Sequence, residues 1–274
     1  YDAWVFRAVS QPLAECREGR GSWRRVGDLV FHAVNPRTWS VNAMDVSIVM
    51  PVFNERAALR ESLDRVLATG IPGEIIIVDD GSVDGTSDVL KDIERSHLDA
   101  CALKVVYQAK NQGKGAAVRR GFQEVSKSIV IIQDADLEYN PSEYMTLITP
   151  ILENKADVVY GSRFLGGPHR VLYFWHSLGN KFLTLISNMF TNVNLSDMET
   201  GYKAFHRSIL ERVHLVSDRF GFEPEFTVKV AKAGFRIYEV PISYEGRTYA
   251  EGKKINWKDG VAAFWWIVKF SLEK

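Results

Sequence analysis

The sequence predicts an α/β fold with a central, mostly parallel sheet that is covered by helices on both faces. Apolar runs rich in Val and Ile alternate with segments of helical spacing between residues 45 and 163, an order typical of a parallel sheet. The connections between these segments are short, as expected for strands joined by helices. At 274 residues, the chain can hold one large domain of this class with an appendage.

Each predicted strand of the first half is a run of β-branched residues that suits burial on both faces. These strands are expected at residues 45–51, 74–78, 103–107, 129–132 and 157–160. Apolar residues at helical spacing predict helices at residues 56–68, from 86 to at least 93, 111–124 and 141–153. The second half is expected to add helices at residues 174–191, from 222 onward and at 255–272, and a strand at 236–242.

A polar or glycine-rich segment follows every predicted strand of the first half. These segments are residues 51–55, 79–82, 111–115, 134–136 and 161–163. The carboxyl ends of parallel strands meet at one edge of a sheet, which is where open α/β sheets bind their ligands. We therefore predict that the segments form one continuous rim with a ligand site.

Two carboxylates, Asp134 and Asp136, follow the buried strand at residues 129–132. Residues two apart in an extended chain point to the same side, so both carboxylates can face one site. Like charges held this close repel each other unless a cation lies between them or one of them takes a proton. Mg²⁺ binds oxygen ligands of this kind beside substrate phosphates. This short motif by itself also fits two solvated aspartates at a polar strand end.

The other charged groups of the rim suit a nucleotide. Asp79 and Asp80 offer acceptors for ribose hydroxyls and base N–H groups, while Lys114 and Arg163 offer donors for phosphates. No G-x-G-x-x-G motif follows the first strand, which disfavours a dinucleotide site, and residues 113–115 lack the spacing of a P-loop. We predict a bound nucleoside diphosphate with a metal ion.

Charge and cysteine content limit the partners and the compartment. Lys and Arg together number 34, as do Asp and Glu, so no net charge attracts nucleic acid, and we expect no nucleic-acid partner. Cys16 and Cys101 have no metal-ligand spacing, which favours reduced thiols in a cytoplasmic protein. No apolar run of the sequence approaches the ~18–20 residues of a membrane span.

Residues 1–43 differ in composition from the rest and are expected to form an N-terminal extension. Trp23 and Val26 belong to a set of apolar residues at helical spacing, and Arg24 and Arg25 lie off that face. The segment is predicted to be either a helix docked on the main domain or an interfacial helix on a membrane, where Trp and Arg are both common.

Several segments together resemble the family-2 glycosyltransferases of GT-A fold, and within them the polyprenyl-phosphate or dolichol-phosphate mannosyl- and glucosyltransferases. The matching segments are residues 51–55 (PVFNE), 78–86 (VDDGSVDGT), 111–117 (NQGKGAA), 134–138 (DADLE) and 161–164 (GSRF). The resemblance extends over most of the chain after residue 44, so residues 44–274 are expected to form a GT-A catalytic domain.

The resemblance also implies roles for particular residues. Those expected to line the base and ribose pocket are Pro51, Val52, Glu55 and Asp80. Asp134 and Asp136 would hold Mg²⁺ or Mn²⁺ on the donor diphosphate. Residues 247–254 resemble the basic loop that closes over this diphosphate, where Arg247 and Lys253 would stabilise the leaving charge. Because these charges face no obvious acidic partner in the sequence, we expect the loop to be mobile without donor and ordered with it.

The implied reaction is an inverting, metal-dependent transfer of a hexose from a GDP- or UDP-hexose to a polyprenyl or dolichyl phosphate. Residues 197–203 are expected to be the acceptor-side loop. An acceptor phosphate is already ionised near neutral pH and needs no strong base, whereas a hydroxyl acceptor would require Asp197, Glu199 or Glu223 as general base. Two alternatives are a transferase acting on a soluble or protein-linked glycan and a nucleotide-sugar-binding module without turnover.

A lipid-phosphate acceptor stays in its bilayer, so we expect a cytoplasmic protein that contacts a membrane peripherally. The candidate contact surfaces are residues 1–43 and the helix at 255–272, in which Trp257 and Lys269 combine apolar and cationic character. Packing of that helix on the core of the domain is the alternative.

Overall fold

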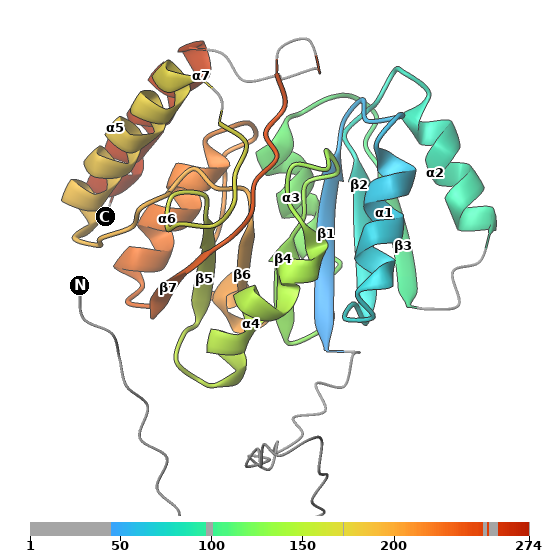
Figure 1. Ribbon diagram of the computed structural model, residues 1–274, viewed down its shortest axis with the longest axis horizontal. Coiled ribbons are helices and arrows are strands. Elements are labelled where there is room, and N and C mark those ends of the chain that lie inside the picture. The colour runs from blue at the N-terminus through green and yellow to red at the C-terminus, as the bar shows by residue number, and fades with distance from the viewer. Residues whose placement is uncertain (1–44, 97–100, 172, 249–250, 252–256, 274) are drawn as a thin grey trace, which may run out of the picture. The chain divides into compact units, whose positions relative to one another are not determined.

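The structure, a computed structural model, describes residues 45–96, 101–171, 173–248, 251 and 257–273 (Figure 1). The chain divides into two units, Tyr1–Val41 and Asn42–Lys274, and every element described below belongs to the second unit. The predicted helix within residues 1–43 lies outside the described residues.

The α/β fold is confirmed, and the described residues form one seven-stranded sheet. Its strand order is β3-β2-β1-β4-β6-β5-β7. The strands are β1 (Val46–Val52), β2 (Glu74–Asp79), β3 (Ala102–Tyr107), β4 (Ile129–Ile132), β5 (Val158–Ser162), β6 (Lys203–His206) and β7 (Ile237–Pro241). The pairs that β6 makes with β4 and β5 are antiparallel and the other four are parallel, so the sheet is mostly parallel, as predicted.

Strand β6 was not predicted; residues 197–202 of the predicted loop at 197–203 form a loop, and its last residue begins the strand. Its first residue, Lys203, interrupts the apolar pattern by which a buried strand is recognised. The Lys203 side chain is nevertheless fully buried, because its Nζ donates to the carbonyl oxygens of Met198 and Thr200 and lies 4.8 Å from the centre of the Tyr160 ring. Since β6 lies between β4 and β5, residues 197–202 enter the predicted rim between these strands.

Helices cover both faces of the sheet, as predicted (Figure 1). One hydrophobic core contains α1 (Leu59–Ala68), α2 (Thr86–Arg95) and α4 (Tyr144–Leu152), and the other contains α3 (Lys114–Phe122), α6 (Phe222–Lys232) and α7 (Trp257–Leu272). Along β4, Ile129 and Ile131 face the first core while Val130 and Ile132 face the second. This alternation requires apolar residues at every position, which is why the strand is a continuous apolar run.

The longest described helix is α5 (Phe174–Thr191), whose 18 residues match the predicted bounds. It packs against α6 and α7. Short 3₁₀ helices, η1 (Pro141–Glu143) and η2 (Arg207–Glu211), precede α4 and follow β6. Within the described part of the chain, no helix combines the length and the apolar content that crossing a membrane requires.

Helix α1 begins three residues later than predicted, at Leu59 rather than at residue 56. The Asn54 side chain does not cap this helix; its Oδ1 accepts a hydrogen bond from the backbone N–H of Val83 at 2.9 Å. Residue 54 has a φ of +52°, a left-handed conformation that Asn tolerates better than most residues. The polar residues at this strand end therefore join two loops of the rim instead of starting the helix.

Helix α3 lies unusually close to β1, because a Cβ atom on Gly121 would come within 2.5 Å of Val49 Cγ1. We expect Gly121→Ala to lower the free energy of unfolding by about 1–3 kcal/mol, since a well-packed core accommodates an added methyl group only by shifting. Urea denaturation followed by circular dichroism measures the change.

The matched control is Gly179→Ala in α5, where an added Cβ would meet no atom within 4 Å. This change should leave stability unaltered or raise it by up to about 1 kcal/mol, because alanine favours a helix more than glycine does. Equal stability of both variants would contradict the close approach of α3 to β1.

Candidate active site

The site lies at the carboxyl edge of the sheet, where the chain leaves β1, β2 and β4 and enters β6. Asp79, at the end of β2, is buried, and its carboxylate accepts hydrogen bonds from the Ser82 backbone N–H and the Ser87 hydroxyl. Each oxygen of Asp79 thus accepts one hydrogen bond, from the loop after β2 and from the first turn of α2 (Thr86–Arg95). That Asp79 offers its carboxylate to a ligand stays a prediction.

Asp80 holds the loop before α3 in place. Its two carboxylate oxygens accept the backbone N–H groups of Gln112 at 2.8 Å and Gly113 at 2.7 Å. Burial raises the pKa of Asp80 above its usual range despite these bonds. The bonds fix residues 111–113 beside the end of β2, so Asp80 positions the backbone that leads to Lys114.

The end of β1 contributes the other residues predicted for the nucleotide pocket. The Val52 side chain is buried in the core, and its carbonyl oxygen accepts the Asp80 N–H at 2.8 Å. Pro51 is half-buried, and Glu55 follows at the rim. Val52 can therefore meet a ligand only through its backbone, and the assignment of these residues to a base and ribose pocket stays a prediction.

Lys114 joins the end of β4 to the first turn of α6. Its Nζ lies 2.9 Å from Asp134 Oδ2 and 3.1 Å from Glu223 Oε1. Burial alone would lower the pKa of Lys114, but the charges of Asp134 and Glu223 outweigh it and raise this pKa well above its ordinary value. Lys114 is therefore a permanent cation between two carboxylates.

Gly201 brings the chain before β6 against this ion pair. A Cβ atom at this position would lie 2.4 Å from Asp134 Oδ2 and 2.9 Å from Lys114 Nζ, so any side chain would displace the pair. The Gly201 N–H also donates to the Tyr139 hydroxyl at 2.9 Å. The sequence analysis assigned no role to this glycine.

Arg247 lies among three carboxylates. Its guanidinium nitrogens are 3.1 Å from Glu55 Oε2, 3.1 Å from Asp136 Oδ2 and 3.3 Å from Glu138 Oε1. The Arg247 backbone N–H donates to Glu138 as well, at 2.8 Å. The expectation that this arginine faces no acidic partner is wrong, because tertiary contacts supply three. Lys253 lies outside the described residues.

Negative charge exceeds positive charge in this part of the site. The carboxylates are those of Glu55, Asp134, Asp136, Glu138 and Glu223, and the cations that pair with them are Lys114 and Arg247. Burial, followed by the charges of Asp134 and Glu138, raises the pKa of Asp136 to about 7. Oxygen donors with an excess of negative charge are the kind that a hard divalent cation such as Mg²⁺ or Mn²⁺ prefers, although among the described residues no three Asp, Glu, His or Cys side chains are grouped as a metal site.

Glu138 is a site residue that the sequence analysis did not single out. Besides Arg247, it accepts a hydrogen bond from the Tyr244 hydroxyl at 2.7 Å. It is the third acidic residue at alternate positions after β4, a signal visible in the sequence. Leu137 has a φ of +64°, so the backbone between Asp136 and Glu138 is not an extended strand and only the structure shows that both face Arg247.

Arg163 and Asp197 form a second ion pair, in which Asp197 is fully buried and Arg163 is mostly buried. Nε and Nη2 of Arg163 donate to the two oxygens of Asp197 at 2.6 and 2.7 Å, and Asn180 Nδ2 adds a third bond at 3.2 Å. Burial raises the pKa of Asp197, but Arg163 outweighs it and the pKa is lowered overall. Asp197 is thus an ion-pair partner with occupied oxygens, which disfavours the general-base role considered for it.

Glu199 and Glu223 are the other two base candidates. Glu199 Oε1 and Glu223 Oε2 are buried and have no hydrogen-bond partner among the described residues. Burial, and then the charge of Glu223, raises the pKa of Glu199 to about 8, while burial lowers the pKa of nearby Lys203 to about 8. Glu199 and Glu223 therefore each have a carboxyl oxygen that could accept a further hydrogen bond.

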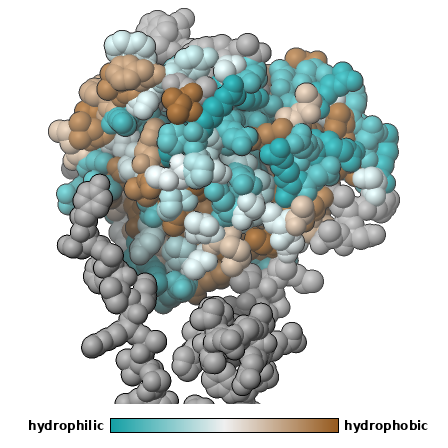
Figure 2. All heavy atoms as spheres, in the orientation of Figure 1, coloured by the Kyte–Doolittle hydropathy of each residue, from teal (hydrophilic) through white to brown (hydrophobic). Residues whose placement is uncertain are grey.

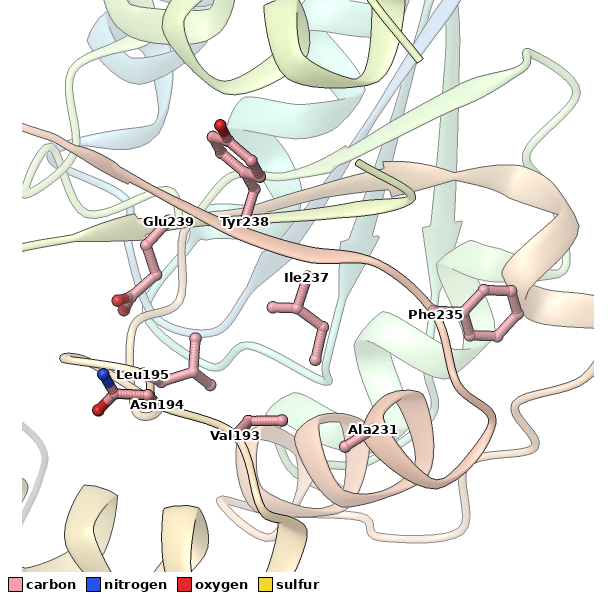
Figure 3. Close-up of a pocket in the computed structure, with 8 residues that line it drawn as sticks. All are labelled: Val193, Asn194, Leu195, Ala231, Phe235, Ile237, Tyr238 and Glu239. Carbon is pink, nitrogen blue, oxygen red and sulfur yellow. The ribbon is translucent and has the colours of Figure 1, made fainter. Parts of the chain in front are cut away.

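A cavity of 470 Å³ lies apart from these residues, at the outer edge of the sheet beside β7 (Figure 3). Its lining is mainly apolar and includes Val193, Leu195 and Ile237. Glu239 connects it to the site, because its carboxylate accepts the backbone N–H groups of Ser196 and Asp197. None of the predicted site residues lines this cavity, so it is not the predicted nucleotide pocket. Its lining residue Glu239 instead holds the Asp197 loop.

The chain belongs to glycosyl transferase family 2, whose sequence profile matches residues 47–213. A dolichol-phosphate mannosyltransferase of Pyrococcus furiosus is 29% identical over 215 residues, which cover 77% of this chain and 59% of that enzyme. A polyprenol monophosphomannose synthase of Mycolicibacterium smegmatis is 29% identical over 213 residues, covering 75% of this chain and 79% of the relative. The chain thus spans less than two thirds of the length of the first of these relatives.

Two solved structures share the fold. Glucosyl-3-phosphoglycerate synthase of Mycobacterium tuberculosis, in complex with Mn²⁺, UDP and phosphoglyceric acid, superimposes with a TM-score of 0.63 at 19% identity over 84% of this chain and 78% of that one. A mannosyltransferase of Pyrobaculum calidifontis in complex with GDP-Man and Mn²⁺ gives a TM-score of 0.52 at 20% identity over 74% and 56%. The domain therefore has the predicted GT-A fold.

We expect Asp197→Asn to lower the free energy of unfolding by about 3 kcal/mol or more, because it leaves the buried Arg163 guanidinium without its counter-charge. Urea denaturation measures this loss. The matched control is Asp157→Asn, which removes a charge from the more exposed pair with Arg236 and should cost less than about 1 kcal/mol. A loss as small for Asp197→Asn as for the control would contradict the structural role of this pair.

Proposed function

We propose that this chain is an inverting, metal-dependent hexosyltransferase that moves a hexose from a nucleoside diphosphate sugar to a polyprenyl or dolichyl phosphate. The observation that carries the proposal is the excess of mostly half-buried carboxylates around Asp134 and Asp136, next to two cations, at the sheet edge where this fold class binds ligands. The lipid-phosphate acceptor is inferred from the relatives, which are named as a dolichol-phosphate mannosyltransferase and a polyprenol monophosphomannose synthase.

Asp134 and Asp136 are the residues that would hold Mg²⁺ or Mn²⁺. Their oxygens suit hard cations, and several of the solved structures that share this fold are complexes with Mn²⁺ or Mg²⁺. When bound, the metal supplies positive charge to the donor diphosphate and so favours its departure. The raised pKa of Asp136 is consistent with a site whose carboxylates repel one another until a cation is present.

Arg247 has two tasks in this proposal. Without donor it pairs with Glu55, Asp136 and Glu138. With donor bound, the guanidinium would turn to the phosphate oxygens, which bind arginine in the same bidentate way as carboxylates do. Lys253 belongs to the same basic segment and is proposed to act with it.

A phosphate acceptor explains why Asp197 is not available as a base. The acceptor oxygen of a phosphate monoester is already charged near neutral pH, so it needs orientation rather than deprotonation. The Arg163–Asp197 pair and Asn180 are joined by hydrogen bonds beside the site, so the Asp197 oxygens are occupied. The protein would act on the cytoplasmic side of a membrane, with which it would make peripheral contact.

A second candidate function is transfer to a hydroxyl group of a soluble acceptor. The unpartnered oxygens of Glu199 and Glu223 favour it, because a general base needs a free acceptor atom near the reacting hydroxyl. The glucosyl-3-phosphoglycerate synthase with the same fold was solved with phosphoglyceric acid, a soluble molecule.

Asp136→Asn should abolish Mn²⁺-dependent binding of the donor and reduce transfer by a factor of about 100 or more, since one metal ligand and one charge are lost. Calorimetric titration of GDP-mannose and UDP-glucose, with and without Mn²⁺, measures binding, and radiolabelled hexose in the lipid phase measures transfer. Chelation of the metal should have the same effect on the unmodified chain. Asp64→Asn on the exposed side of α1 is the control, and near-normal turnover of Asp136→Asn would refute the site.

Glu223→Gln should distinguish the two candidate functions. The amide preserves a hydrogen bond to Lys114 but is not a base, so transfer to a polyprenyl phosphate should fall by less than about tenfold. With a hydroxyl acceptor the loss should be about 100-fold to 10,000-fold, the usual contribution of a general base. Rates with a short-chain polyprenyl phosphate and with a soluble sugar acceptor, measured side by side, test this. A large loss with the lipid phosphate would contradict the first proposal.

A further inference from the structure

We infer that the outer face of α5, together with the adjoining face of α7, rests on an anionic lipid bilayer. The inference depends on the proposed function, because a lipid-linked acceptor is what brings the protein to a bilayer. It identifies the contact surface and its position relative to the site, which the proposed function leaves open.

Helix α5 carries a large apolar stripe on its outer side, unlike an ordinary surface helix. Trp175 (76% exposed), Phe182 (53%), Leu185 (56%) and Met189 (71%) point away from the protein. A surface helix of a soluble domain normally buries its apolar stripe and exposes its polar one.

The side of α5 that faces the protein is mixed: Leu183 and Ile186 pack against the core, and polar groups lie beside them. Thr184 and Ser187 are buried there, and Asn180 and Asn188 are half-buried. Each of these asparagines is hydrogen-bonded to the segment that precedes β6, through Asp197 and through Leu195. The polar side of α5 thus belongs to the folded domain, and its apolar side is left without a described partner.

Helix α7 extends the same surface. Trp265 (62% exposed) and Leu272 (71%) lie seven residues apart on its outer side, while Ile267 and Phe270 are buried. The two helices pack against each other and lie side by side at one end of the domain (Figure 1). Figure 2 shows hydrophobic side chains gathered over this end. A contiguous apolar surface of this kind marks a contact with a protein or a membrane.

Charge favours the bilayer over a protein partner. Residues 174–191 contain Lys181 and no Asp or Glu, and Lys181 is exposed beside Phe182. On α7, Lys269 Nζ lies 4.8 Å from the centre of the Trp266 ring. Large apolar side chains flanked by cations bind interfaces reversibly, and more strongly when the lipids are anionic. A protein partner would in addition be expected to meet acidic or hydrogen-bonding groups on the rim of the surface.

The position of α5 connects this surface to the site. On its inner side, Asn180 bonds to Asp197, and Thr184 Oγ1 accepts the Met198 N–H at 3.2 Å. The apolar surface and the acceptor-side segment are therefore separated by one helix, about 10 Å across. A lipid phosphate could enter beside α5 while its hydrocarbon chain remains in the bilayer.

The test is flotation of the full chain with vesicles made of equal parts phosphatidylcholine and phosphatidylglycerol, without donor or acceptor. The variant Trp175→Ser/Phe182→Ser/Leu185→Ser should bind at least about tenfold more weakly, because each large apolar side chain that leaves water changes a partition constant by about that factor. Lys181→Gln should weaken binding at low salt only, since screening removes its contribution at high salt.

The matched control is Met145→Ser/Val216→Ser/Tyr238→Ser, which removes three exposed apolar side chains from other parts of the domain. It should bind vesicles as the unmodified chain does. Equal binding by the α5 variant and the control would overturn the inference. So would an unmodified chain that ignores vesicles but forms a dimer that the α5 variant loses, because the face would then be an interface between two copies.

Two further measurements separate this inference from the proposed function. The α5 variant should keep the donor affinity of the unmodified chain in calorimetric titration, and its transfer to a short-chain polyprenyl phosphate dissolved in detergent should be unchanged. Vesicle binding through α5 without any transfer would refute the proposed function alone. Transfer in detergent by a chain that never binds vesicles would refute the contact surface alone.

Discussion

The accumulation of negative charge at the carboxyl edge of the sheet is the constraint on which the rest of the site depends. The segment after β4 delivers Asp134, Asp136 and Glu138 to one place, and Glu55 and Glu223 arrive from other segments. Such a group of carboxylates, largely withdrawn from water, is stable only if cations lie among them or protons are taken up. Lys114 and Arg247 are those cations, and the positive charge of each would also attract a phosphate ligand.

The antiparallel strand β6 shapes one side of the site. By separating β4 from β5, it brings Gly201 into contact with Asp134 and places the Arg163–Asp197 pair behind the site. Asp197 on this side is held by several partners, Arg163 and Asn180 among them. The charges around Arg247 belong to a segment in which the sequence offers further cations after residue 248.

Helix α5 belongs to both the site and the surface. Its polar side completes the hydrogen bonds of the segment before β6, and its apolar side faces outward. If α5 rotated so that its outer apolar side chains became buried, Asn180 would lose its hydrogen bond to Asp197. The exposed surface is in this sense a consequence of how the site is held.

The sequence alone determined the elements whose residues repeat with a simple period. The continuous apolar run of β4, buried on both faces, and the 18 residues of α5 could be predicted, as could the grouping of strand ends that contains Asp134, Asp136 and Lys114. β6 could not, because Lys203 is buried through contacts with Tyr160 and backbone carbonyls that no local pattern encodes. The partners of Arg247 and Asp197 were decided by tertiary structure for the same reason: Glu55 is 192 residues from Arg247, and Arg163 is 34 from Asp197. Period and composition report on neighbours along the chain, whereas the protonation and pairing of a buried charge depend on neighbours in space.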